Sequence, residues 1–120
     1  MKLGFFVSKK IDQLAKRSDD LMKNGKYADA VECYQKIIDL LPAPKEQWEA
    51  YEWSIVSIAD TYYFTEDYDK AEFYFNNIIH TAENPFIFLR YGQIQYYLNE
   101  VESSKEYLKR AYSLEGAEIF

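Results

Sequence analysis

The residue types that most often carry out chemistry are scarce in this chain. His80 is its only histidine and Cys33 its only cysteine, so neither a thiol–imidazole pair in close sequence nor a histidine-rich zinc set is available. The four glycines are isolated and form no phosphate-binding loop. Glu49 and Glu52 could act as a carboxylate pair, but their spacing is that of neighbours on a helix surface. We therefore expect no enzyme activity, no metal site and no cofactor.

Helices must position any binding site, and the clearest helical pattern runs from 24 to 42. Ala30, Tyr34, Ile37 or Ile38, and Leu41 recur there at three- and four-residue steps, which places them on one side of an α-helix. Asn24-Gly25 ahead of this stretch predicts a turn, and Pro42 behind it predicts the end of the helix. The lone cysteine, Cys33, is expected to be a small buried residue, which fits a cytoplasmic location.

The pattern of an alanine followed four residues later by an aromatic residue occurs in this stretch and again downstream, and a third, weaker copy follows. The three copies carry, in order, Ala30 and Tyr34, Ala71 and Phe75, and Ser104, Leu108 and Ala111. The chain therefore contains an internal repeat.

Start and stop signals predict six helices in three pairs. Ser8 is expected to cap a first helix that carries Ile11, Leu14, Ser18 and Leu21 and ends near Asn24-Gly25. The later helices are expected at about 45 to 64, with Pro44 at its start, 68 to 81, 85 to 98 and from just after Asn99-Glu100 to 114. Asn84-Pro85 is a favoured cap followed by a favoured first helical residue.

These residues resemble the tetratricopeptide repeat (TPR), whose frame is Trp-x-x-Leu-Gly-x-x-Tyr in one helix, Ala-x-x-x-Phe in the next and a closing Pro. The first half is matched by Ile55-x-x-Ile58-Ala59-x-x-Tyr62 and by Phe88-x-x-Tyr91-Gly92-x-x-Gln95. The resemblance implies an all-α fold, a right-handed α-α superhelix of three helix pairs (about 8–42, 45–83 and 85–115) in a single domain, 1–120. Small residues are then expected where paired helices approach closely, at Ala30, Ala59, Ala71 and Gly92.

The chain departs from this frame in three places. About seven residues are inserted between the first two repeats, at 42–51. Leu14-x-x-Arg17-Ser18-x-x-Leu21 matches the first repeat poorly. The third repeat lacks a following helix, so Tyr107, Tyr112 and Leu114 must be covered by Ile119 and Phe120 or by a second chain.

Repeats of this family are similar in lining a concave groove with the first helix of each pair. Carrying those positions over predicts an aromatic groove with acidic spots. Its partner-binding residues are Asp19, Met22, Trp53, Val56, Asp60, Tyr63, Phe86, Gln93 and Tyr96, with Ala15 and Leu89 on the same lining. Core packing is the alternative interpretation for Tyr63, Tyr96 and Tyr97. Family members that bind the C-terminal carboxylate of a chaperone tail have Lys and Asn at the positions of Ala15 and Asp19. The acidic Asp19 would repel that carboxylate, so binding of chaperone tails is disfavoured.

Charge and hydropathy narrow the classes of partner. The net charge is −6, and residues 42–120 carry fourteen acidic against six basic side chains. Direct nucleic-acid binding is therefore not expected, whereas a basic protein partner is favoured. The apolar run Leu3–Val7 is shorter than the core of a secretory signal, and we expect it to pack as a short segment on the first helix. No stretch is long enough to span a membrane.

The sequence thus favours a non-enzymatic protein-binding module. Small acidic stand-alone repeat proteins of this kind are similar to bacterial immunity proteins, which inhibit a basic cognate toxin. The alternative is a general adaptor or scaffold that self-associates through its last helix, as a homodimer.

Overall fold

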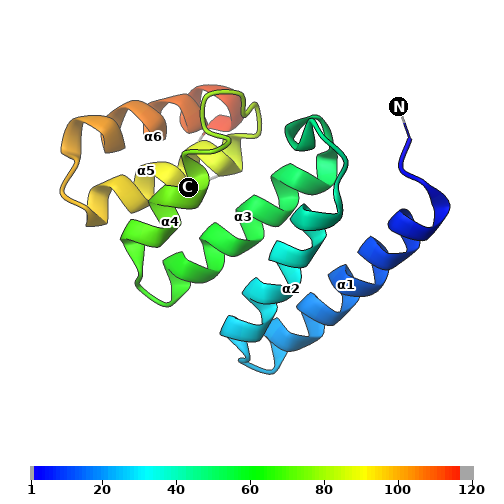
Figure 1. Ribbon diagram of the computed structural model, residues 1–120. Coiled ribbons are helices and arrows are strands. Elements are labelled where there is room, and N and C mark those ends of the chain that lie inside the picture. Colours follow the sequence, from blue (N-terminus) through cyan, green and yellow to red (C-terminus); the bar gives the residue numbers. More distant parts are fainter. Residues whose placement is uncertain (1, 117–120) are drawn as a thin grey trace. The chain divides into compact units, whose positions relative to one another are not determined.

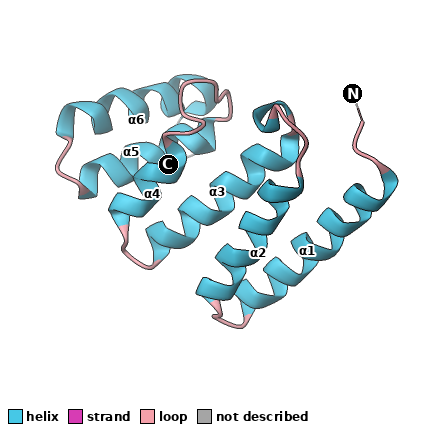
Figure 2. Ribbon diagram, viewed as in Figure 1, coloured by secondary structure: helices cyan, strands magenta, loops and turns pink. Residues whose placement is uncertain are grey.

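The computed structural model describes residues 2–116, and in them all regular structure is helical (Figures 1 and 2). The helices are α1 (Phe5–Lys23), α2 (Tyr27–Leu40), the short 3-10 helix η1 (Lys45–Gln47), α3 (Glu49–Phe64), α4 (Tyr68–Phe75), α5 (Pro85–Tyr97) and α6 (Val101–Glu115). The all-α class that the sequence predicts is confirmed. The described residues divide into two compact units, which end and begin at Ile58 and Ala59, inside α3.

The first unit contains the α1–α2 hairpin, whose two helices pack side by side (Figure 1). The face of α1 that carries Ile11, Leu14 and Ser18 is buried, as is the α2 face that carries Ala30 and Cys33. Burial of one face of each helix is the usual source of helical stability in a small domain. The predicted core face of the first repeat is therefore confirmed, including its buried thiol, except that Leu21 is only half-buried.

The second unit is organised by the α5–α6 hairpin, with α4 packed on α5 (Figure 1). Gly92 lies at the tightest point, because a Cβ atom there would come within 2.8 Å of the Leu108 side chain. Ser104 closes the same contact by donating a hydrogen bond from its hydroxyl to the Gly92 carbonyl over 2.8 Å. Ala59 and Ala71 are fully buried, as is Ala30 in the first unit. The close approach expected at Gly92 is thus present, and the three alanines are buried as expected.

Three helical hairpins turn through one shared backbone geometry. The central residue of each turn has a positive φ: Gly25 at 72°, Glu66 at 64° and Asn99 at 63°. The next residue donates its N–H to a carbonyl five positions earlier, over 2.9 Å from Lys26 to Leu21, 2.8 Å from Asp67 to Tyr62 and 2.8 Å from Glu100 to Gln95. This is the Schellman arrangement, which satisfies the last carbonyls of a helix.

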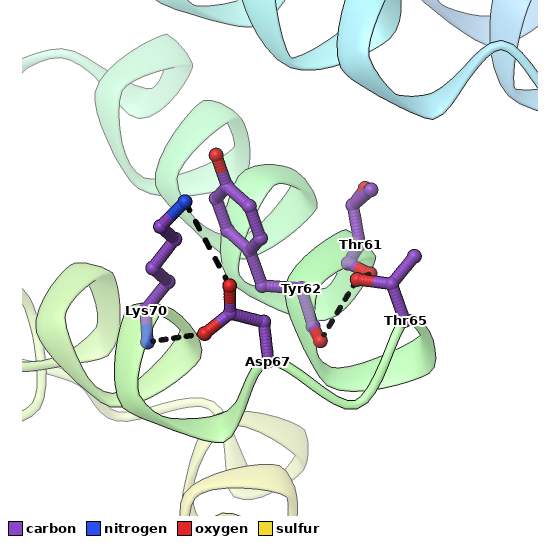
Figure 3. A network of polar contacts seen from close by, with 5 residues as sticks. All are labelled: Thr61, Tyr62, Thr65, Asp67 and Lys70. Carbon is purple, nitrogen blue, oxygen red and sulfur yellow. Dashed lines mark hydrogen bonds and ion pairs between the residues drawn. The ribbon is translucent and has the colours of Figure 1, made fainter.

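The turn between α3 and α4 has additional side-chain bonds (Figure 3). The Asp67 carboxylate accepts the Lys70 backbone N–H over 3.3 Å and lies 3.7 Å from the Lys70 ammonium group. The Thr65 hydroxyl donates to the carbonyls of Thr61 and Tyr62, over 3.2 Å in each case. Asp67 therefore caps α4, where an acidic side chain is favoured by the free N–H groups of the helix start.

The beginning of α1 differs from the sequence prediction. The helix starts at Phe5 instead of after Ser8, and the Ser8 N–H already donates to the Gly4 carbonyl over 2.9 Å. Phe5 and Phe6 are consequently part of the helix and are 73% and 84% exposed, so the expected packing of Leu3–Val7 as a separate segment is wrong. Extension of the helix towards its N-terminus outweighs the preference of Ser8 for a capping position, because each added helical residue gains a backbone hydrogen bond.

The predicted helix at 45–64 is interrupted at Trp48. Only Lys45–Gln47 forms a 3-10 turn, and Trp48 is extended, with φ −92° and ψ 137°, before α3 begins at Glu49. The indole Nε1 of Trp48 donates to the Pro42 carbonyl over 2.8 Å. This bond holds Trp48 against the preceding loop, so the helix cannot run through it.

The predicted helix at 68–81 is also shorter than expected, because α4 ends at Phe75. The following residues form turns, in which the Asn77 N–H donates to Tyr74 three positions earlier. The Asn77 side-chain amide donates to the carbonyls of Phe73 and Tyr74, over 3.1 and 3.2 Å. Asparagine competes in this way for the carbonyls that a continuing helix would need. In contrast, the start of α5 is as predicted, with the Asn84 side chain accepting the Phe86 N–H over 2.9 Å.

The last helix is covered only in part. Tyr107 is buried, whereas Tyr112 and Leu114 are exposed on α6. Ile119 and Phe120, the residues expected to cover this face, lie outside the described residues.

Candidate functional site

Arg90 of α5 lies at the centre of a cluster of polar and aromatic side chains in the second unit. Its Nε donates to the Asp60 carboxylate over 2.7 Å, and its Nη1 donates to the Gln93 side-chain oxygen over 2.8 Å. The Arg90 and Asp60 side chains are 14% and 23% exposed, so the ion pair is largely withdrawn from water. Charge-assisted bonds of this kind fix both side chains in place.

Three aromatic rings surround the guanidinium group of Arg90. Its central carbon lies 4.2 Å from the ring centre of Tyr63, 5.0 Å from that of Phe64 and 5.2 Å from that of Phe86. These distances are within the range of cation–π attraction. The end of α3 and the start of α5 are therefore joined through one arginine.

A row of tyrosines extends this cluster. Tyr68 and Tyr97 stack with ring centres 4.6 Å apart, and Tyr63 lies 6.2 Å from Tyr97. Tyr96 and Tyr97 are 64% and 51% exposed. We call this surface the Arg90 patch, and it comprises Asp60, Tyr63, Phe64, Tyr68, Phe86, Arg90, Gln93, Tyr96 and Tyr97. It offers exposed ring area beside a half-buried cation.

Burial controls the electrostatics of the ion pair. Desolvation raises the pKa of the Asp60 carboxyl above its ordinary value, and the charge and hydrogen bond of Arg90 act in the opposite direction. Asp60 therefore depends on Arg90 to remain charged at low cost. Its negative charge is neutralised locally, so Asp60 is not the free acidic spot that the sequence suggested.

The structure brings together five of the predicted partner-binding residues in the second unit. Asp60, Tyr63, Phe86 and Gln93 all lie within the patch around Arg90, and Tyr96 joins it through a ring contact with Tyr97 at 5.6 Å. Tyr96 and Tyr97 are exposed, so the core-packing interpretation is wrong for them, whereas Tyr63 is half-buried.

The other four predicted residues belong to the first unit. Asp19 is exposed and accepts a hydrogen bond from the Tyr34 hydroxyl over 3.3 Å, and burial raises the pKa of that tyrosine. Trp53 is 38% exposed, and Met22 and Val56 are half-buried. Their part in partner binding stays a prediction.

Reasoning from the sequence missed Arg90, Phe64 and Tyr68. A signal for Arg90 was present, because Phe86, Arg90 and Gln93 are spaced four and three residues apart and so share one helix face. The groove positions that the family frame marks on this helix are other residues, and Arg90 lies between two of them.

In residues 2–116, no group of three or more His, Cys, Asp or Glu side chains is placed to hold a metal ion. The structure also contains, in the part it describes, no helix with the length and apolar character needed to cross a membrane.

Comparisons with known proteins agree with this architecture. The family model described as Tetratricopeptide repeat matches residues 54–83 and 87–118, just over half of the chain. No curated protein matches the sequence. The first TPR of Spaghetti (RPAP3), solved bound to the HSP90 peptide SRMEEVD, is similar with a TM-score of 0.75 and 23% identity, covering 92% of this chain and 82% of that one.

A second solved structure has a similar fold. It is the type III secretion chaperone SycD of Yersinia enterocolitica in complex with a peptide of the translocator YopD, with a TM-score of 0.76 and 16% identity. The match covers 96% of this chain and 83% of that one. At these identities the likeness establishes the shared fold.

Proposed function

This chain belongs to the tetratricopeptide repeat family, and from that premise we propose that it is a non-enzymatic module that binds a segment of a partner protein through the Arg90 patch. The observation that carries the proposal is the exposure of Tyr96 and Tyr97, which are linked through Tyr63 to the ring-enclosed Arg90. Aromatic residues and arginine are the usual anchors of protein interfaces. The two similar structures, each solved with a peptide, support this class of function.

The patch suits an interface because its polar atoms are already held in place. Asp60 and Gln93 fix the guanidinium group of Arg90, so a partner would meet a rigid surface. Rigid anchors lose little side-chain entropy on binding. The guanidinium group also carries more N–H donors than these two bonds use, which leaves hydrogen-bonding capacity for a partner's carbonyl groups.

We further propose that the partner is basic and that the specific role is an immunity-type inhibitor of a basic toxin domain, acting in the cytoplasm. The net charge of −6 supports a basic partner. In that case the on-rate of a captured partner should fall steeply as salt is added. An on-rate indifferent to salt would count against a basic partner.

The main test compares tyrosines of similar exposure inside and outside the patch. A partner is first captured from native lysate with the full chain, identified and purified, and its dissociation constant is then measured. Tyr96→Ala and Tyr97→Ala should each weaken binding about tenfold or more, as truncation of an aromatic anchor does. Tyr27→Ala, which removes a tyrosine that is 44% exposed on α2, should leave the affinity unchanged. Equal affinities for all three variants would contradict the proposal.

The exposed end of α6 favours a second candidate, an adaptor that self-associates there. Tyr112 and Leu114 are 55% and 57% exposed. Light scattering over a range of concentrations would then show a dimer that Leu114→Ser abolishes. A monomer at every concentration would eliminate this candidate.

A further inference from the structure

The first unit contains a second aromatic surface, formed where the chain departs from its repeat frame. Two adjoining pockets of about 610 and 400 Å³ lie between the start of α3, the η1 segment and the N-terminal part of α1. They share the lining residues Gln47, Trp48, Glu49 and Trp53. We call this surface the tryptophan groove.

The inserted residues at 42–51 build this groove. The bond from the Trp48 indole to the Pro42 carbonyl fixes one ring, and Trp53 follows within the first turns of α3. Lys45, in the same insertion, is turned away, since its ammonium group donates to the carbonyls of Ile38 and Leu41 over 2.9 and 2.6 Å. It thus satisfies the end of α2 and leaves the charges of the groove unbalanced.

Those charges are predominantly negative. Glu46, Glu49 and Glu52 line the groove, and among the residues that the structure describes none of them takes part in an ion pair. Lys2 is the one basic lining residue in the described part of the chain, and Asp12 lines the same pocket. Acidic residues at a helix start also complement its dipole, but three carboxylates exceed the roughly half positive charge of a helix end.

From this arrangement we propose that the tryptophan groove binds a lysine or arginine side chain of a partner protein. Among the aromatic side chains, the indole ring of tryptophan attracts a cation most strongly through its face, and the adjacent carboxylates add charge attraction. The glutamates of the groove would repel an acidic ligand, and a purely apolar ligand would make no favourable contact with their charges. The inference uses Trp53 but does not rest on the Arg90 patch.

The chain is suited to test this, because Trp48 and Trp53 are its only tryptophans. Intrinsic tryptophan fluorescence of the full chain therefore reports on the groove alone. Oligolysine and oligoarginine peptides should change this fluorescence in a saturable way at low salt, and added salt should weaken the change. Oligoglutamate should have no effect. Absence of a saturable change with both basic peptides would overturn the proposal.

Variants of equal charge separate the groove from the general acidity of the chain. Glu49→Gln combined with Glu52→Gln should weaken oligolysine binding about fivefold or more. Glu32→Gln combined with Glu83→Gln removes the same charge from exposed positions outside the groove and should have a clearly smaller effect. Equal losses in the two pairs would show non-specific attraction and overturn the site.

Trp53→Leu tests the ring itself, since leucine keeps an apolar side chain without a π face. Calorimetry should show oligolysine affinity about threefold weaker than in the parent chain. Unchanged affinity would contradict the cation–π contact. Tyr96→Ala, which tests the Arg90 patch, should leave oligolysine binding intact, so failure of this proposal and failure of the proposed function are distinguishable.

Discussion

The Arg90 patch and the tryptophan groove both combine aromatic rings with carboxylates, but they differ in what the carboxylates contact. In the patch, Asp60 is bonded to an internal arginine at 2.7 Å, and three rings enclose that arginine. In the groove, Glu49 is exposed and Glu52 is half-buried, and no internal cation pairs with either of them among the described residues. The difference indicates that the carboxylate charge of the patch stabilises the fold, whereas the carboxylate charges of the groove are available to a ligand.

The largest expected effect is in the patch. Arg90→Met should destabilise the fold by about 2–3 kcal/mol in urea unfolding, because it leaves the half-buried Asp60 carboxylate without its partner. The variant should regain stability as the pH falls. Burial raises the pKa of Asp60 above its unfolded value, so the folded state takes up a proton first and is favoured by acid.

The control is the double variant with Asp60→Asn. It removes the unpaired charge, so its stability should exceed that of Arg90→Met alone at neutral pH and should lack the recovery in acid. If Arg90→Met unfolds at the same urea concentration as the parent chain, the ion pair is not structural and the contrast with the groove disappears.

An intermediate effect is expected at the turns, which share one backbone geometry in the two units but differ in the residue at positive φ. Gly25 in the first unit and Glu66 in the second both have positive φ, and a Cβ at Gly25 would meet nothing within 4 Å. Gly25→Glu should therefore cost about 1 kcal/mol from backbone strain alone, and Glu66→Gly should stabilise by about 0.5–1 kcal/mol. Thermal unfolding measures both. Changes of the same sign would contradict the shared geometry.

The smallest effect is expected in the groove. Glu49→Gln and Glu52→Gln should each change the free energy of unfolding by no more than about 0.5 kcal/mol, since no ion pair is lost. The matched comparison is Asp60→Asn in the patch, which leaves Arg90 unpaired and should cost more. Equal costs for the glutamate and aspartate variants would show that the groove carboxylates are structural as well.

The sequence was sufficient to predict the helix pairs because their signals are local and repeated. Ala30 and Ala71 occupy matching places in the second helix of a pair, and Ala59 and Gly92 do so in the first helix. A small side chain at such a position lets two helix backbones approach closely. The hairpin turn at Gly25 and the cap at Asn84 were likewise readable from residue type.

What the sequence could not supply depends on contacts between distant residues. The break at Trp48 arises from a bond to Pro42, and the pairing of Asp60 with Arg90 spans thirty residues. Neither has a local pattern. Five patch residues were predicted from the repeat frame, while Arg90, which organises them, lies between the positions that the frame marks.

The division at Ile58 and Ala59 also separates the natural spectroscopic probes of the chain. Both tryptophans and the only thiol, Cys33, belong to the first unit, whereas the only histidine, His80, belongs to the second. Fluorescence and thiol labelling of the unmodified protein therefore follow the opening of the first unit, since Cys33 is buried and reacts only after exposure. The proton resonances of His80 follow the second unit, so the two units can be observed separately without an introduced label.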